Sequence, residues 1–275
     1  MESYSVLMSV YYKEKAEYFR ESILSMLKQT VVTDDFVIVC DGPLTKELDA
    51  VIEEVQKQYP ELFQIIRLKE QQGLGNALCQ GISFCKNELI ARMDSDDISV
   101  PDRCLMQLES FQKKDIDLCG GNIVEFTTDI SDAGVKRQVP KTNEEIRQFA
   151  KRRNPFNHPA VMFRKSSVLK AGNYKDCLGF EDYYLWARML GCGGKGYNIQ
   201  ETLVYMRTGE GMYERRGGFG YAVKGIKARW KIYRTGVSKF SDFLISAGGQ
   251  VIVSLIPVGL RSRFYGKFLR KNPSN

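Results

Sequence analysis

The chain has 275 residues, of which 43% are hydrophobic and 27% are charged, and this composition is typical of a folded globular protein. That length supports one large domain, or one domain with an appendage. A single histidine and seven scattered cysteines, with no Cys-x-x-Cys pair, argue against a structural zinc site and favour reduced thiols in a cytoplasmic protein. No signal peptide is expected, because no charged segment followed by an apolar one opens the chain.

The net charge of +7 is unevenly distributed. Residues 215–275 contain thirteen Lys and Arg against a single acid, Asp242, so this tail carries +12 and the rest of the chain carries −5. Such an asymmetry predicts a catalytic or binding body followed by a segment that seeks an anionic partner.

Apolar runs alternate with helical patterns in the first part of the chain. Strands are predicted for residues 5–10, 36–40, 63–68 and 89–93. The clearest helix lies between Leu48 and Tyr59 and ends at Pro60. Continuous apolar strands joined through helices indicate an α/β fold with a mainly parallel, Rossmann-like sheet that is covered on both faces.

The pattern changes after a predicted helix through residues 104–111. Further strands are expected at residues 118–126, 160–163 and 203–206, and further helices at 143–153 and from Glu181 onward. In the tail, residues 224–234 predict a basic amphipathic helix. The apolar segment 243–260 is interrupted by Gly248-Gly249-Gln250 and Pro257, which makes it a poor membrane-spanning helix.

Three carboxylates lie within four residues at Asp94-Ser95-Asp96-Asp97, directly after the fourth predicted strand. Clustered carboxylates raise one another's pKa values unless solvent or a cation relieves their repulsion. Magnesium and manganese prefer carboxylate oxygen, and magnesium sites use one or two protein carboxylates with water and substrate phosphate. The alternative is a turn or a helix cap, but Ser99 and Asp102 beside Pro101 already supply capping groups. We therefore predict a cation site that holds a diphosphate.

Polar residues follow three of the first four predicted strands. These are Tyr11-Tyr12, Asp41-Gly42 and Asp94–Asp97. Because ligands of such sheets bind outside the carboxyl ends of the strands, we expect these side chains to line one crevice.

An ordered set of motifs over residues 4–207 resembles family 2 glycosyltransferases. The motifs are Tyr11 after the first strand, Val-Cys-Asp41-Gly after the second, Gly73-Leu-Gly-Asn-Ala-Leu, Met-Asp94-Ser-Asp96-Asp97-Ile-Ser-Val-Pro, Asn157-His158-Pro159 and Glu181-Asp182-Tyr-Tyr-Leu-Trp. The chain is most similar to bacterial enzymes that build capsule, exopolysaccharide or O-antigen units on a lipid carrier.

The resemblance implies a GT-A fold, a nucleotide-sugar donor, a divalent cation (Mn2+ or Mg2+) and inversion at the anomeric carbon. It divides the chain into a catalytic domain at residues 1–214 and a basic helical extension at 215–275. Within the domain, residues 1–112 would form the nucleotide-binding half and residues 113–214 the acceptor-binding half.

The resemblance also implies roles for single residues. Donor nucleotide binding falls to Ser9, Tyr11, Asp41, Asp94, Ser95 and Asp96, and metal binding falls first to Asp96, then to Asp94 and Asp97. Asp182 matches the catalytic base, although an acid at a helix start has an ordinary structural role on position alone. Glu181 would orient that base or contact the acceptor. One departure is Cys40, which stands where the family has a first acid before Asp41.

Two further residues are candidates for contact with the acceptor or the diphosphate, namely His158 and Arg207. A structural loop role is the alternative for His158. Residues 207–220 are glycine-rich and basic, so they would form either a lid over the donor or a plain linker.

The functional hypothesis is transfer of a sugar from a nucleotide-diphosphate donor, with UDP favoured over GDP or dTDP, to a lipid-linked or oligosaccharide acceptor. Residues 221–275 would lie on an anionic membrane surface, peripheral to the inner face of the cytoplasmic membrane, or would pack on the body or on a second subunit of a homodimer. No nucleic-acid partner is expected. The alternatives are a sugar-phosphate nucleotidyltransferase, which normally has a glycine- and basic-rich loop after the first strand, and a non-enzymatic membrane adaptor, which does not require the acids.

Overall fold

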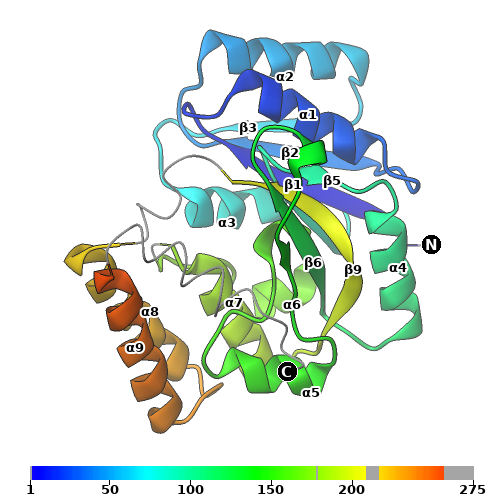
Figure 1. The fold of residues 1–275 in the computed structure, drawn as a ribbon. Coiled ribbons are helices and arrows are strands. Elements are labelled where there is room, and N and C mark those ends of the chain that lie inside the picture. The colour runs from blue at the N-terminus through cyan, green and yellow to red at the C-terminus, as the bar shows by residue number, and fades with distance from the viewer. Residues whose placement is uncertain (1, 178, 209–216, 257–275) are drawn as a thin grey trace.

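Figure 1 shows the computed structural model, which describes residues 2–177, 179–208 and 217–256. Within these residues a nine-stranded sheet forms the centre of the body, with the order β3-β2-β1-β4-β8-β6-β9-β5 and with β7 paired to β6. Helices cover both faces of the sheet, and the last two helices form a hairpin at its side (Figure 1). The predicted α/β architecture with a C-terminal helical extension is therefore confirmed.

The first half of the sheet is parallel and consists of the four strands expected from the apolar runs. They are β1 (Tyr4–Val10), β2 (Asp35–Cys40), β3 (Phe63–Arg67) and β4 (Leu89–Asp94). Every residue of β2 is buried, which explains why its sequence is apolar without alternation. Successive residues of β1 point to opposite faces, so Val6 and Met8 join one core cluster and Leu7 joins the other.

Two groups of helices supply the residues that complete these cores. One face carries α1 (Ala16–Leu27), α2 (Lys46–Gln58) and α4 (Arg103–Lys113), and the other carries α3 (Leu74–Phe84), α5 (Asn143–Ala150), α6 (Lys165–Lys170) and α7 (Glu181–Gly191). The N-terminus of α2 is capped by the Thr45 hydroxyl, which accepts a hydrogen bond from the Leu48 amide. Gly73 precedes α3 with a φ of +88°, a left-handed conformation that glycine adopts without strain.

The second half of the sheet is mixed. It contains β5 (Ile98–Ser99), β6 (Leu118–Phe126), β7 (Lys136–Arg137), β8 (Met162–Arg164) and β9 (Gly196–Arg207), with 3-10 turns at Ile130–Asp132 and His158–Ala160. β8 runs antiparallel between β4 and β6, whereas β6 and β9 are parallel. The predicted strand at 203–206 is too short, because β9 already pairs with β6 from Gly196 onward. Its first residues are polar, and the side-chain amide of buried Asn198 donates hydrogen bonds to the carbonyls of Pro140 and Pro155.

The C-terminal extension consists of α8 (Phe219–Tyr233) and α9 (Phe240–Leu255). The expected helix over 224–234 corresponds to α8, but the expected interruption at Gly248-Gly249 is wrong, because α9 continues through both glycines. Packing against α8 stabilises it there, since the Gln250 side chain lies directly over Gly225. No helix in the described parts of the chain is both long enough and apolar enough to cross a membrane. The predicted domain boundary at 214/215, most of the possible lid and residues 257–275 lie outside the described residues.

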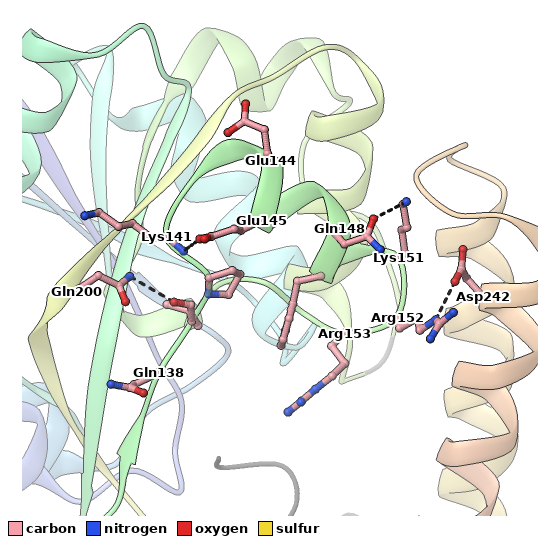
Figure 2. A pocket seen from close by; sticks show the side chains of 13 residues that line it. Gln138, Lys141, Glu144, Glu145, Gln148, Lys151, Arg152, Arg153, Gln200 and Asp242 are labelled. Atoms are coloured by element: carbon pink, nitrogen blue, oxygen red, sulfur yellow. Dashed lines mark hydrogen bonds and ion pairs between the residues drawn. The ribbon is translucent and has the colours of Figure 1, made fainter. Parts of the chain in front are cut away.

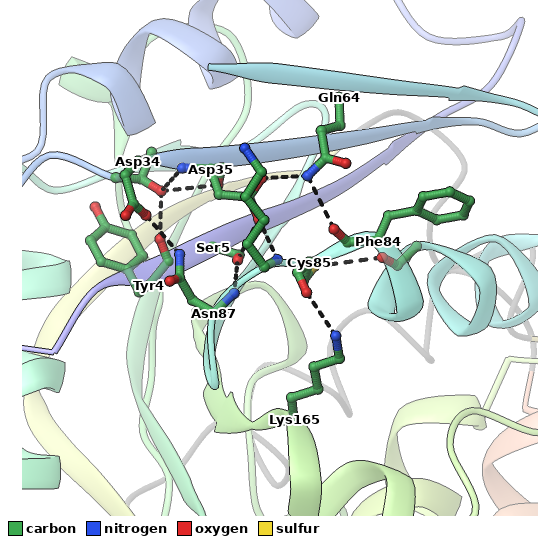
Figure 3. A network of polar contacts seen from close by, with 12 residues as sticks. Tyr4, Ser5, Asp34, Asp35, Gln64, Phe84, Cys85, Asn87 and Lys165 are labelled. Carbon is green, nitrogen blue, oxygen red and sulfur yellow. Dashed lines mark hydrogen bonds and ion pairs between the residues drawn. The ribbon is translucent and has the colours of Figure 1, made fainter. Parts of the chain in front are cut away.

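A polar network closes the amino-terminal edge of the parallel strands (Figure 3). The Asp35 carboxylate accepts hydrogen bonds from the Ser5 hydroxyl at 2.6 Å, from the Gln64 side-chain amide and from the Lys86 backbone amide. The Ser5 hydroxyl also accepts a hydrogen bond from the Asn87 amide. This network joins β1, β2, β3 and the turn before β4, and it leaves the opposite edge of the sheet for a ligand.

All seven cysteines lie in the described part of the chain and are free thiols, and five of them are buried. Burial raises the pKa of Cys40 to about 11 and that of Cys119 to about 12, so both stay protonated at neutral pH. The five buried thiols therefore lie in structural positions in the protein interior.

Candidate active site

The carboxyl ends of β1, β2 and β4 bring the first group of candidate residues to one edge of the sheet. Ser9 pairs in register with Asp94, and the Asp41 amide donates to the Val10 carbonyl at 2.8 Å. Tyr11 follows β1 directly and leaves 38% of its side chain exposed, so its ring is available to a flat ligand at this edge.

Asp41 lies buried beyond the end of β2. Its two carboxylate oxygens accept hydrogen bonds from the backbone amides of Gln72 and Gly73, at 2.7 and 2.9 Å. The side chain therefore positions the loop that leads into α3, and any contact with a nucleotide base would use its remaining lone pairs.

Asp94 forms an ion pair with a fully buried arginine. Arg92 lies two residues earlier on β4, and both of its terminal nitrogens donate to the two Asp94 oxygens. Burial alone would lower the pKa of Arg92, but the neighbouring carboxylate of Asp94 raises it instead. The bidentate pair fixes Asp94 and neutralises its charge, which makes it a weaker ligand for a cation than an unpaired carboxylate.

Asp96 lies among other acids and forms no ion pair within the described residues. Burial, followed by repulsion from Asp94 and Glu14, raises its pKa to about 7. Glu14 is held nearby, because its carboxylate accepts a hydrogen bond from the Ser95 hydroxyl at 2.9 Å. A carboxylate with such a raised pKa gains most from a bound cation.

Asp97 is buried behind the cluster. One of its oxygens accepts a hydrogen bond from the Arg207 amide at 2.7 Å, and the other has no partner within the described structure. Burial, followed by repulsion from Asp96 and Asp94, raises its pKa well above the usual range. The Asp97 side chain therefore joins the end of β9 to the acidic loop, defined here as residues 94–97.

Arg207 is buried below the same loop and does not point into open solvent. Its guanidinium donates to the backbone carbonyls of Asp96 and Thr128 and forms a 2.7 Å ion pair with Glu21. It also lies over the rings of Tyr18 and Phe126. These contacts engage the Arg207 guanidinium, for which the sequence predicted contact with the acceptor or the diphosphate. They also position the acidic loop.

The second group of candidate residues lies at the start of α7. Asp182 accepts hydrogen bonds from the Asn154 side-chain amide at 2.6 Å and from the Tyr183 amide at 2.7 Å. Burial raises the pKa of Asp182, and these two hydrogen bonds offset part of that rise. Glu181 accepts from the Gly179 amide, and its side chain packs against Gly75 in the first turn of α3.

His158 lies in the loop between α5 and β8. One ring nitrogen is 2.9 Å from the Tyr174 hydroxyl, and the ring also packs beside Trp186. Burial and the nearby charge of Arg92 lower its pKa well below the usual value. A neutral histidine offers a hydrogen bond to a ligand but no positive charge for a phosphate.

Arg92 is a buried charged residue beside the candidate site that the sequence prediction did not single out. It pairs with Asp94, and its charge offsets part of the rise that burial causes in the pKa values of Tyr174 and Asp182. A signal was present, because an arginine within a fully buried strand requires a charged partner. Another fully buried arginine, Arg103, donates to the carbonyls of Arg92 and Val161 and holds this part of β4 in place.

The residues present fit a hard cation. The donor set consists of carboxylate oxygens, Asp96 has a strongly raised pKa, and one buried Asp97 oxygen has no partner in the described structure. Within the described residues no three His, Cys, Asp or Glu side chains form a complete ligand cluster. A magnesium-type site does not need three protein ligands, because one or two carboxylates are completed by water and substrate phosphate.

An Arg92→Met variant should lower the free energy of unfolding by about 2–3 kcal/mol, because it leaves Asp94 without its partner. This loss is smaller than the full cost of breaking a buried ion pair, because Asp94 is partly exposed. Urea denaturation would measure the loss. The control is Arg67→Met, which breaks an exposed ion pair with Asp49 and should cost less than about 1 kcal/mol. Equal losses in both variants would contradict a structural role for the Arg92–Asp94 pair.

A separate cavity of about 830 Å3 lies between α5, β9 and α9 (Figure 2). Its wall contains Lys141, Arg153 and the ion pair between Arg152 and Asp242. None of the candidate site residues lines it, and its walls mix both signs of charge, so we assign it no ligand.

Comparisons with known proteins identify the family of the chain. A sequence profile described as glycosyl transferase family 2 matches residues 5–173. The chain is 36% identical over 269 residues to UDP-Gal:alpha-D-GlcNAc-diphosphoundecaprenol beta-1,3-galactosyltransferase of Escherichia coli, covering 98% of this chain and 97% of that protein. It is 37% identical over 234 residues to the amylovoran biosynthesis glycosyltransferase AmsE of Erwinia amylovora, covering 84% of each chain.

The fold is shared with a solved structure at low sequence identity. The mannosyltransferase PcManGT of Pyrobaculum calidifontis, in complex with GDP-Man and Mn2+, superposes with a TM-score of 0.67 at 13% identity, covering 91% of this chain and 69% of that one. The GT-A fold expected from the motifs is thereby confirmed.

Proposed function

The chain belongs to glycosyl transferase family 2, and from this premise we propose that it moves a sugar from a uridine-diphosphate donor to a lipid-linked saccharide acceptor, with inversion, in bacterial surface polysaccharide synthesis. The donor and acceptor classes are supported by the Escherichia coli relative, whose name specifies UDP-Gal and a diphosphoundecaprenol-linked sugar and which matches this chain over nearly its whole length. Family membership favours this function over a nucleotidyltransferase or a non-enzymatic adaptor.

The observation that carries the proposal is the acidic cluster at the carboxyl end of β4, where buried Arg92 pairs with Asp94 and the pKa of Asp96 is raised to about 7. At the start of α7, Asp182 is held by the Asn154 side-chain amide and has a raised pKa. A diphosphate at the acidic loop and a base at α7 would then lie on opposite sides of a sugar bound between them, as inversion requires.

On the donor side, the acidic loop would bind the diphosphate through a divalent cation, with Asp96 as its main protein ligand. Such a cation neutralises the charge that develops on the departing diphosphate. Tyr11 would stack on the base, and Asp41 with Ser9 would contact the nucleoside. Asp94 and Ser95 would lie along the ribose, each held by a contact within the protein.

On the acceptor side, Asp182 would accept the proton of the attacking hydroxyl. Its raised pKa increases its basicity, and the Asn154 amide holds one of its oxygens in a fixed direction. The inverted product forms because the acceptor oxygen attacks the anomeric carbon opposite the leaving diphosphate.

Nucleotide-sugars should raise the melting temperature only when a divalent cation is present. With ligand at about a hundred times its dissociation constant, a protein of this size should gain roughly 5 °C or more. The measurement is a thermal-shift panel of UDP-, GDP- and dTDP-sugars with Mn2+, with Mg2+ or with a chelator. UDP-sugars should give the largest shift.

The control for this panel is the cation without nucleotide, which reports any effect of the metal alone on stability. An equal shift with metal and with chelator would contradict the proposed cation site. A shift with GDP-sugars and none with UDP-sugars would keep the cation site and contradict the donor assignment.

A further inference from the structure

Helix α9 has an inverted distribution of polar and apolar residues. The residues that it buries against the protein include Asp242, Gln250 and Ser254, of which Ser254 is only 1% exposed. The residues that it turns outward form an apolar stripe, defined here as Leu244, Ile245, Ile252 and Leu255. These four side chains are between 54% and 63% exposed, whereas a helix on a water-facing surface normally shows the opposite pattern.

The polar inner face of α9 is fully engaged. Asp242 forms an ion pair with Arg152 at the end of α5, and the Gln250 amide donates to the Ser254 hydroxyl at 3.0 Å. Arg229 of α8 donates to the Gln250 side-chain oxygen. These contacts fix the rotation of α9, so the outward direction of the apolar stripe is a property of the fold.

Helix α8 places positive charge on the neighbouring surface. Lys224, Lys227, Lys231 and Arg234 follow one another at helical spacing, and all four are exposed. The segment 217–256 carries six Lys and Arg against one acid. Aromatic rings join the two helices, since Trp230 lies 5.4 Å from Phe243 and both Trp230 and Phe240 remain about half exposed.

We propose that the α8–α9 hairpin docks on an anionic membrane, with the apolar stripe of α9 entering the acyl region and the basic residues of α8 meeting the headgroups. An exposed apolar stripe beside a basic face is the pattern of helices that lie in the membrane interface. Trp and Tyr at the junction suit the headgroup level, where a ring meets both water and acyl chains.

The hairpin also lies beside the proposed catalytic base. Phe180, which directly precedes Glu181 and Asp182, contacts the ring of Tyr221 in α8, with ring centroids 5.9 Å apart. Ile232 of α8 packs with Tyr183 and Ala187 of α7. Figure 1 shows the hairpin next to α7 and far from α1 and α2. A hairpin docked on the membrane would bring the base close to a lipid-linked acceptor. This link to the acceptor rests on the proposed function, whereas the docking itself does not.

The test is flotation of the full-length protein with vesicles, without any sugar donor or acceptor, so that its result is independent of the proposed reaction. Vesicles of phosphatidylglycerol and phosphatidylethanolamine should bind the protein, and vesicles of phosphatidylcholine alone should bind it weakly. The triple variant Leu244→Ser, Ile245→Ser, Ile252→Ser should lower the partition coefficient by about tenfold or more. Its melting temperature should stay close to that of the wild type, because all three side chains are exposed.

Matched controls distinguish docking by the hairpin from nonspecific hydrophobic or electrostatic binding to the vesicles. Val32→Ser with Phe84→Ser and Leu169→Ser removes three comparably exposed apolar side chains elsewhere and should leave flotation unchanged. Lys224→Glu with Lys227→Glu should weaken binding about tenfold or more, whereas the same charge change on α2 should not. That α2 control is Lys46→Glu with Lys57→Glu.

Three outcomes would overturn the proposal. The first is that the triple serine variant floats with the vesicles as well as the wild type does. A second is no flotation of the wild type together with a dimer that the triple serine variant dissociates, which would assign the apolar stripe to a second copy of the chain. The third is no flotation of a monomeric wild type.

Discussion

An Asp96→Asn variant is expected to lose about a thousandfold in kcat/KM for sugar transfer, because asparagine keeps the shape of the side chain but not the charge that a cation requires. Burial and the carboxylates of Asp94 and Glu14 raise the pKa of Asp96 to about 7, so this side chain gains more from a cation than any fully paired acid nearby. Steady-state kinetics with a UDP-sugar would measure the loss of kcat/KM. Calorimetric titration of Mn2+ without acceptor would measure the accompanying loss of cation affinity.

Two variants serve as controls for this prediction. Asp94→Asn should lose less activity than Asp96→Asn, because Arg92 already neutralises that carboxylate. Asp49→Asn lies in an exposed ion pair on α2 and should leave activity unchanged. Loss of Mn2+ affinity in Asp94→Asn, with normal affinity in Asp96→Asn, would transfer the role of main ligand to Asp94.

The parallel half of the sheet could be predicted because its central strands β1, β2 and β4 are buried on both faces. A short continuous apolar run such as 36–40, when helical stripes stand on either side of it, is typical of a central strand in a covered parallel sheet. The same rule placed Asp41 and Asp94 together, since the carboxyl ends of parallel strands meet at one edge. These predictions needed only local patterns.

The mixed half could not be predicted in the same detail, because pairing partners rather than local patterns determine it. β5 and β7 have two residues each, and they exist through their contacts with β9 and β6. The start of β9 is hidden by polar residues such as Asn198, which is buried only because two proline carbonyls accept its hydrogen bonds. No sequence period reports such contacts.

The direction of charged side chains was also beyond the sequence. Arg207 follows an apolar strand and precedes a glycine-rich segment, so a role at the diphosphate was a reasonable expectation. In the structure its guanidinium lies under the acidic loop, where Glu21 and two backbone carbonyls hold it. For Arg92 the missing information was its burial, because the apolar residues around it predicted only a strand and not a buried ion pair. Arg207 binds residues that are distant from it in the sequence, whereas the partner of Arg92 lies only two residues away on the same strand.

An Asp182→Asn variant is expected to lower kcat by about a thousandfold while leaving donor affinity unchanged, because the base acts on the acceptor hydroxyl and not on the nucleotide. Glu181→Gln is the matched control, since it removes the neighbouring charge and should cause a much smaller loss. A larger loss in Glu181→Gln than in Asp182→Asn would exchange the two roles.

The pH profile supplies a second measurement of the same carboxylate. Burial raises the pKa of Asp182 above the usual aspartate value, and the base accepts a proton only when it is ionised, so kcat/KM should fall as the pH decreases through that raised pKa. The charge of Arg92 favours the ionised form of Asp182. In Arg92→Met the acidic limb should therefore move to higher pH, whereas Arg67→Met should leave it in place. An acidic limb that stays unchanged in Arg92→Met would mean that the group titrating in kcat/KM is not Asp182.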